Sequence, residues 1–335
     1  MKLKRIFNFI LLIFMLFTLS SCFSNDIIGP NTSGEYFSSK TYSVTFIYNN
    51  NSPNTVIDVK KGSTVSAVED PIKTNYNFVG WYTNYNFSEK YDFSKSVNNN
   101  LTLYAKYEID AKTITNKIST DLIKGIVKIY NKCYNKTFFG NEKDVITGQG
   151  SGFCFYENQG VYYTITNCHV AVKNPSSSYQ EYTIEDYQGN TYKGYLYENP
   201  NSKLFGIDAT YDLACLYFFA GSTNVKELNI ASKNLSVNED VISLGAPNGQ
   251  SNTITYGKIQ KYGQVKLECE SYQSNVTFDV AIHNAYINHG SSGGPLLDAN
   301  LNVIGVNYGG SEAGNIGSAI PAEKLIEFLN KYLRS

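Results

Sequence analysis

The sequence predicts an all-β protein with one C-terminal helix, and three observations indicate this. The 335 residues include 28 Tyr and 19 Phe but one Trp, and Tyr-rich alternating segments with Asn- and Gly-containing turns are typical of β structure. From about Asp121 to Ser335 the chain shows many short apolar runs separated by glycines, which favours a barrel or a sandwich. The segment Pro321–Leu333 has proline at its start and an apolar stripe, as expected of a final helix.

The first 22 residues have the pattern of an export signal. Lys2, Lys4 and Arg5 precede an apolar run from Ile6 to Leu19, in which only Asn8 and Thr18 are polar. The following Leu19-Ser-Ser-Cys22 resembles a bacterial lipobox, which implies that Cys22 is lipidated; the alternative is a plain secretory signal with an incidental cysteine. We therefore expect an exported protein, lipid-anchored to the outer face of the cell membrane.

Two further segments precede the main domain. Residues 23–41 are rich in Ser, Asn and Gly without periodicity, which predicts a flexible tether. Residues 42–107 contain several alternating strands, including the pieces Tyr76-Asn-Phe-Val-Gly-Trp-Tyr82 and Thr102-Leu-Tyr-Ala-Lys-Tyr107.

These pieces resemble the internalin-type B repeat, a small β-grasp-like module of bacterial surface proteins. The resemblance implies a spacer or an adhesive module with a partner at the surface. We expect Trp81 and its aromatic neighbours to form the core of this small domain and not a ligand platform. Residues 108–119 are predicted to be a linker, and residues 120–335 the main domain.

Charge and cysteine content exclude several classes of function. The formal net charge is −1 with 17% charged residues, which gives no reason to expect nucleic acid as a partner. An odd number of cysteines follows Cys22, so they cannot all pair within one chain, and their spacing matches no zinc motif; they are Cys133, Cys154, Cys168, Cys215 and Cys269. We expect them to be apolar fillers of strands. We assign structural or solvated roles to His283 and His289, and expect no metal.

A candidate nucleophile lies in the run Gly290-Ser-Ser-Gly-Gly-Pro295. Small residues let this backbone turn tightly and direct N–H groups inward. Ser292 is the predicted nucleophile, with an oxyanion hole formed by the N–H groups of Gly290 and Ser292. A surface turn of glycine and serine would show the same composition, so the run needs partners elsewhere in the chain.

Two other segments supply those partners. His169 directly follows a strong strand and is the candidate base, and Asp212 leads an apolar strand and is the candidate orienting acid. Asp208 competes for that role, and Asp212 is preferred because it abuts the buried strand. The order His, Asp, Ser is that of chymotrypsin, and it differs from those of subtilisin and the α/β-hydrolases. A lipase or esterase is disfavoured by this order and because the sequence shows no Gly-x-Ser-x-Gly elbow between a strand and a helix.

The quoted motifs, with Gly148-Gln-Gly-Ser-Gly-Phe153 and Gly314-Asn-Ile-Gly-Ser-Ala-Ile-Pro321, make residues 120–335 resemble bacterial trypsin-like proteases of the HtrA (Deg) type. The resemblance implies two six-stranded antiparallel β-barrels of the chymotrypsin fold, with the triad between them. It also implies protein or peptide substrates and no cofactor. Tyr308, Gly309 and Gly310 match the strand that pairs with substrate, and Tyr286 lies near the expected base of the S1 pocket.

The sequence departs from the HtrA pattern at three points. Ser291 stands where Asn or Asp is usual, which leaves the support of the loop open, and Tyr286 is placed to narrow the S1 pocket. A C-terminal PDZ domain is not expected. Two functions therefore remain: a surface-tethered serine endopeptidase, or a non-catalytic binding lipoprotein whose protease fold is inactive. The sequence gives neither the substrate nor the oligomeric state.

Overall fold

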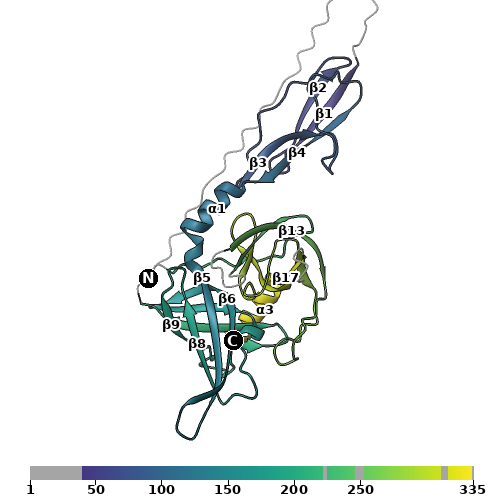
Figure 1. Ribbon diagram of the computed structural model, residues 1–335. Helices are drawn as coiled ribbons and strands as arrows, with labels where there is room; N and C mark the ends of the chain where they lie inside the picture. Colours follow the sequence, from purple (N-terminus) through teal and green to yellow (C-terminus); the bar gives the residue numbers. More distant parts are fainter. Residues whose placement is uncertain (1–39, 222–224, 246–252, 311–315, 334–335) are drawn as a thin grey trace, which may run out of the picture.

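The computed structural model describes residues 40–221, 225–245, 253–310 and 316–333, which form a small sheet domain and two barrels (Figure 1). The predicted signal peptide, Cys22 and all but the last two residues of the predicted tether lie outside the described residues. Among the residues that the structure describes, no helix is long and apolar enough to cross a membrane.

The N-terminal domain is a four-stranded sheet in the order β2-β1-β4-β3, in which β1 and β4 are parallel. Its strands are β1 (Thr41–Ile47), β2 (Thr55–Lys60), β3 (Tyr76–Tyr82) and β4 (Leu101–Ile109). The Trp81 ring is 3% exposed and meets the rings of Phe46 and Tyr48 edge-on, with centroids 4.9 and 5.4 Å apart. The prediction that Trp81 belongs to the domain core is confirmed.

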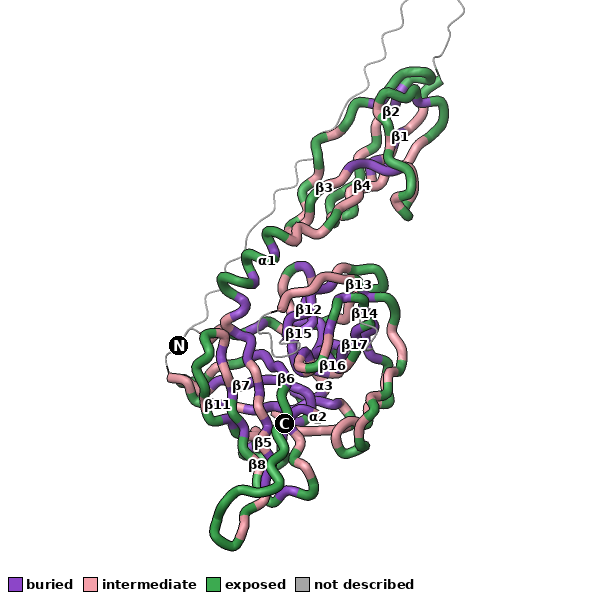
Figure 2. Tube along the Cα trace, viewed as in Figure 1, coloured by how far each residue is buried: buried purple, intermediate pink, exposed green. Residues whose placement is uncertain are grey.

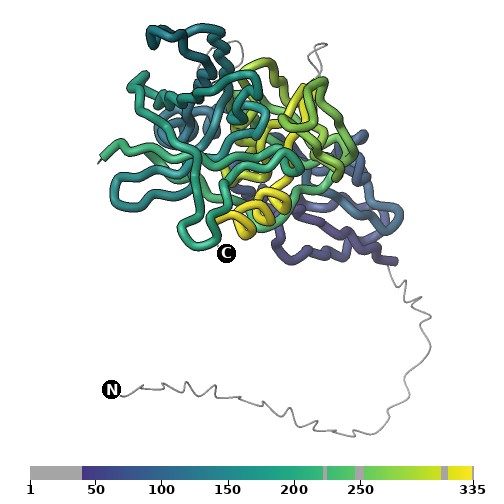
Figure 3. Tube along the Cα trace, turned by 90° about the horizontal axis from the view of Figure 1, so that it is seen from below, coloured from purple at the N-terminus to yellow at the C-terminus, as the bar shows by residue number. Residues whose placement is uncertain are grey.

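A helical segment connects this sheet to the barrels. The predicted linker 108–119 forms the end of β4 and most of α1 (Ala111–Thr120), which is followed by a short 3-10 helix, η1 (Leu122–Gly125). Ile114 and Ile118 of α1 are buried in the main hydrophobic core. The sheet domain also contacts the second barrel, since Asn75 Nδ2 donates a 2.7 Å hydrogen bond to the Ala299 carbonyl. Figure 3 shows the sheet domain beside that barrel.

The first barrel contains β5 (Ile126–Lys136), β6 (Glu142–Asn158), β7 (Val161–Thr166), β8 (Tyr179–Glu185), β9 (Thr191–Leu196) and β11 (Leu213–Phe219). The pairing of β11 with β9 closes it, and the short β10 (Ile207–Asp208) pairs with the first two residues of β11. A single helical turn, α2 (Cys168–Ala171), follows β7.

The second barrel is closed in the order β12-β13-β14-β17-β16-β15. Its strands are β12 (Asp240–Gly245), β13 (Thr253–Gly263), β14 (Val280–His283), β15 (Pro295–Leu297), β16 (Val303–Gly310) and β17 (Gly317–Pro321). The predicted final helix is α3 (Ala322–Tyr332), with Pro321 at its N-cap. Figure 2 shows the buried strands of both barrels converging at their junction, beside which α3 packs. The predicted architecture of two six-stranded barrels is confirmed.

Candidate active site

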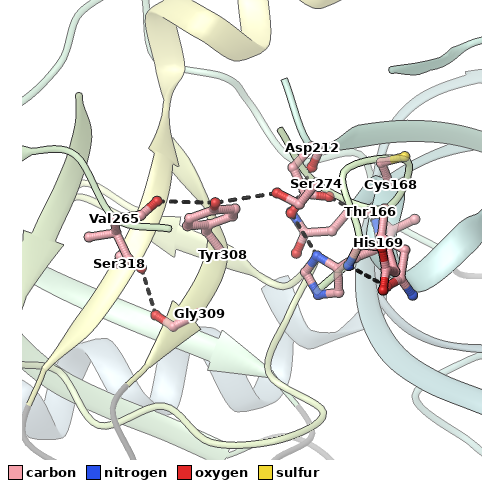
Figure 4. Close-up of polar contacts among 12 residues, drawn as sticks. Thr166, Cys168, His169, Asp212, Val265, Ser274, Tyr308, Gly309 and Ser318 are labelled. Carbon is pink, nitrogen blue, oxygen red and sulfur yellow. Dashed lines mark hydrogen bonds and ion pairs between the residues drawn. The ribbon is translucent and has the colours of Figure 1, made fainter. Parts of the chain in front are cut away.

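The candidate base is fixed by the turn that carries it. His169 lies in α2, directly after β7 ends, with a side chain that is 19% exposed. Its ring Nδ1 lies 2.6 Å from Asp212 Oδ2, and its backbone N–H donates a 2.9 Å hydrogen bond to Asp212 Oδ1 (Figure 4). Because a carboxylate only accepts, Nδ1 carries the proton and Nε2 is left free to accept one.

Asp212 is fully buried in the turn that leads into β11. Its φ of +48° lies in the left-handed region, which Asp tolerates better than most residues. The Asn167 side-chain amide donates to the Asp212 carbonyl at 2.9 Å, which ties this turn to the residue before α2. Asp212 therefore meets His169 through contacts made entirely within the first barrel.

Asp208, the competing residue, has a different role. Its carboxylate accepts hydrogen bonds from Tyr332 Oη at 2.6 Å and Lys331 Nζ at 3.0 Å, both on α3, and from Thr210 Oγ1 at 2.7 Å. Burial alone would raise the pKa of Asp208, but the hydrogen bonds from these three residues hold it below its usual value. Asp208 fastens the C-terminal helix to the first barrel, and none of the hydrogen bonds described for its carboxylate comes from His169.

The candidate nucleophile lies on a turn of the second barrel. Ser291 N–H donates to the Asn288 carbonyl at 2.9 Å, and Gly290 between them has a φ of +92°. A closed four-residue turn with positive φ at its third position is of type II, which explains why glycine stands there. Ser292 follows directly, and Gly293 (φ +86°) leaves no room for a Cβ against Ser151 and Thr166.

The base and the nucleophile line one cavity of about 260 Å³. Its walls combine His169, Gly290 and Ser292 with residues of β5, β6 and the segment after α2. Within the described residues, no hydrogen bond joins the Ser292 hydroxyl to the His169 ring. Catalytic hydrogen bonds are often loose without substrate, so shared access to one cavity is the relevant observation.

Sequence reasoning did not identify the polar side chains that hold α2 in place. Asn131, buried on β5, donates from Nδ2 to the carbonyls of Val170 and Val172 at 3.0 and 2.9 Å. Gln180 on β8 donates to the Ala171 carbonyl at 2.7 Å. The sequence feature that could have indicated this role is an amide residue at an inward-facing position of an apolar strand, because a buried polar group needs a hydrogen-bond partner.

The predicted substrate strand is β16, and its end borders the site. β15 pairs with β16 only as far as Val306, whereas β17 pairs on the other side as far as Gly310. Among the described residues, Tyr308, Gly309 and Gly310 thus have an edge without a partner strand. The Tyr308 side chain itself is buried: its hydroxyl donates to the Val265 carbonyl at 3.2 Å and lies 3.3 Å from Ser274 Oγ (Figure 4).

Two of the three departures from the HtrA pattern, Ser291 and Tyr286, lie within the described residues. Ser291 Oγ accepts a 3.2 Å hydrogen bond from Asn288 N, so this serine supports the turn in place of a larger amide or acid. The Tyr286 hydroxyl accepts from Asn288 Nδ2 at 2.9 Å, and the ring is 41% exposed. Tyr286 is not among the residues that line the cavity of His169 and Ser292.

The remaining cysteines and histidines show no ligand arrangement. The five described cysteines are free thiols, and burial raises the pKa of Cys168, which precedes the base, with the charge of Asp212 adding to the shift. Over residues 40–221, 225–245, 253–310 and 316–333, no group of three or more His, Cys, Asp or Glu side chains is placed to hold a metal ion. His283 is buried in the second barrel and His289 is exposed.

Two segments of the chain match known domain families, and the fold matches a solved structure. Residues 150–306, which hold His169, Asp212 and Ser292, match the trypsin-like peptidase domain. Residues 42–106 match the Listeria-Bacteroides repeat domain. The active form of the Rv3671c protease from M. tuberculosis superposes with a TM-score of 0.51 at 22% identity, covering 67% of this chain and 87% of that one. The fold is therefore the chymotrypsin-like double barrel.

Curated relatives are serine proteases of the HtrA/Do-like type. The chain is 33% identical to serine protease Do-like HtrB of Bacillus subtilis (strain 168) over 192 residues, which cover 55% of this chain and 38% of that protein. It is 30% identical to serine protease Do-like HtrA of the same organism over 226 residues, which cover 64% of this chain and 47% of that protein. The chain thus spans less than half the length of these two relatives.

Proposed function

We propose that this protein is a serine endopeptidase that hydrolyses peptide bonds through a His169–Asp212–Ser292 triad. The observation that carries the proposal is that His169, hydrogen-bonded to the buried Asp212, lines the same cavity as Ser292. The similarity to HtrA/Do-like serine proteases supports the same chemistry. A non-catalytic binding protein would need neither a buried acid nor an oriented imidazole.

In this mechanism, the hydroxyl oxygen of Ser292 attacks the carbonyl carbon of the substrate peptide while His169 Nε2 takes the hydroxyl proton. The Asp212 carboxylate, which accepts from Nδ1, stabilises the imidazolium that forms. The imidazolium then gives its proton to the departing amine, leaving an acyl ester on Ser292. Water attacks the ester by the same steps in reverse, with His169 as base, and releases the carboxylic product.

The negative charge that develops on the substrate oxygen needs nearby donors. The N–H groups of Gly290 and Ser292 are the proposed donors. Among the described residues, neither N–H group donates a hydrogen bond to an acceptor of the protein, so both can bind the substrate oxygen. Each such donor contributes about 3 kcal/mol to transition-state stabilisation in enzymes of this kind. The open edge of β16 at Tyr308–Gly310 would pair with the substrate backbone by strand addition.

The proposed location is the outer face of the cell membrane, with a lipid on Cys22 and the repeat as a spacer. The support is the charged and apolar signal pattern followed by Leu19-Ser-Ser-Cys22. Cys22→Ala is expected to block lipid processing and to change the protein's distribution between membrane and medium. Wild-type membrane retention and processing in this variant would contradict the anchor.

Casein cleavage by the purified protein tests the proposed activity. We expect fragments to appear, and a serine-directed fluorophosphonate to stop their formation. A folded protein that neither cleaves casein nor takes up the fluorophosphonate would instead support the non-catalytic surface protein.

A further inference from the structure

Ser151, on β6 of the first barrel, contacts the nucleophile turn of the second barrel at two points. Its hydroxyl donates a 2.6 Å hydrogen bond to the Gly290 carbonyl, and its backbone N–H donates a 2.8 Å hydrogen bond to the Ser292 carbonyl. Its own carbonyl accepts from Thr166 Oγ1 at 2.7 Å, which fastens it to the end of β7. The residue is fully buried, so these bonds form out of contact with water.

The two carbonyls that Ser151 binds belong to the two residues whose N–H groups are the proposed oxyanion donors. Gly290 has no side chain through which the protein could fix its backbone, and its positive φ is one of several states open to glycine. A hydrogen bond to its carbonyl is therefore an effective way to hold its position. The same residue holds Ser292, so both donors are positioned against a single point on β6.

Close backbone packing around Ser151 makes this contact specific. A Cβ on Gly150 would lie 3.1 Å from the Ser292 carbonyl oxygen and still closer to Val170. A Cβ on Gly293 would overlap the Ser151 carbonyl oxygen and Thr166. Glycines on both sides thus let the nucleophile turn lie directly on β6, at the distance that the two hydrogen bonds require.

We propose that Ser151 is a positioning residue, which sets the oxyanion donors of the second barrel relative to His169 of the first barrel. The inference rests on the proposed function. Ser151 does not itself line the cavity, and its hydrogen bonds go to backbone carbonyls and not to the reacting atoms, so it acts through Gly290 and Ser292. Ser151 is expected to affect the stabilisation of the tetrahedral oxyanion, because it places the donors, and not the binding of the substrate chain.

The experiment compares Ser151→Ala with the wild-type protein on a quenched fluorescent peptide. Loss of the hydroxyl leaves the buried Gly290 carbonyl without its donor, and we expect kcat to fall about 10- to 100-fold while KM changes less than about twofold. Binding of a peptide boronate, which mimics the tetrahedral adduct, should weaken by a similar factor. Ser151→Cys keeps an atom at the γ position but offers only a weak donor, and should show the same pattern if the alanine variant folds poorly.

Thr164→Val is the matched control, because it removes another fully buried hydroxyl in the same barrel, one that contacts Cys154 and not the nucleophile turn. This variant should keep the wild-type kcat even if its thermal unfolding midpoint falls as far as that of Ser151→Ala. A wild-type kcat in Ser151→Ala, or an equal loss of kcat in Thr164→Val, overturns the positioning role alone. If Ser292→Ala cleaves the peptide as fast as the wild type, the proposed function fails and the inference falls with it.

Discussion

The two barrels hold their catalytic candidates in different ways. In the first barrel, the base is fixed by hydrogen bonds of 2.6 and 2.9 Å from its ring and its backbone to the buried carboxylate of the acid. In the second barrel, the nucleophile lies on a glycine turn whose position depends on backbone contacts with β6 across the junction. The orientation of the imidazole is thus built into one barrel, whereas the placement of the serine depends on how the two barrels pack.

The largest expected loss of activity comes from removing the nucleophile, which the second barrel supplies. Ser292→Ala should lower kcat by at least about 10⁵-fold, because the attacking oxygen is removed. Ser291→Ala loses only a 3.2 Å hydrogen bond from Asn288, and its kcat should fall no more than about tenfold. Steady-state hydrolysis of a fluorogenic peptide measures both. Similar losses in the two variants would mean that the turn has been assigned the wrong nucleophile.

The acid of the first barrel is tested by contrasting two aspartates. Asp212→Asn should lower kcat by about 10⁴-fold with little change in folding, because the imidazole loses the partner that fixes its tautomer. Asp208→Asn should leave kcat within about threefold of the wild type but destabilise the protein by about 1–3 kcal/mol, because it weakens the bonds to α3. Peptide hydrolysis and urea unfolding separate the two effects. The assignment fails if the kinetic loss follows Asp208.

The second barrel also contains a titratable group outside the site, His283. Burial lowers the pKa of His283 to about 4, whereas an unfolded histidine has a pKa near 6.5. The unfolded chain therefore binds more protons between these values, and the free energy of unfolding should fall by about 3 kcal/mol as the pH drops from 6.5 to 4. Urea unfolding across this range should show a smaller decrease in His283→Met. If the free energy of unfolding of that variant depends on pH as strongly as that of the wild type, His283 does not cause the loss of stability at low pH.

The smallest expected effect concerns the repeat. Burial raises the pKa of Tyr76, and the carboxylate of Asp240 in the second barrel adds to the shift, so the Tyr76 hydroxyl lies near that carboxylate. Tyr76→Phe should weaken the contact by about 1 kcal/mol and leave kcat on a short peptide unchanged. Faster hydrogen exchange in α1 measures the loosening, and Tyr85→Phe, at an exposed position of the repeat, is the control. A change in kcat would mean that the repeat acts on the catalytic barrels.

The sequence predicted the barrels, the final helix and the three candidate residues because each has a local pattern. Alternating strands, a histidine at a strand end and a glycine turn are visible within a few residues. It did not reveal Ser151, although the run Gly148–Phe153 contains it, because its partners lie 139 and 141 positions later in the chain. For the same reason the sequence favoured Asp212 over Asp208 as the orienting acid but could not show the role of Asp208. That role depends on how α3 docks, since Asp208 contacts Tyr332.

The most direct test of the account is to map the site of fluorophosphonate modification by mass spectrometry. The proposed triad predicts one modified peptide with the label on Ser292, and no label after His169→Ala, because the hydroxyl then lacks its base. Modification of Ser291 or of a serine elsewhere, or undiminished labelling in Ser292→Ala, would contradict it.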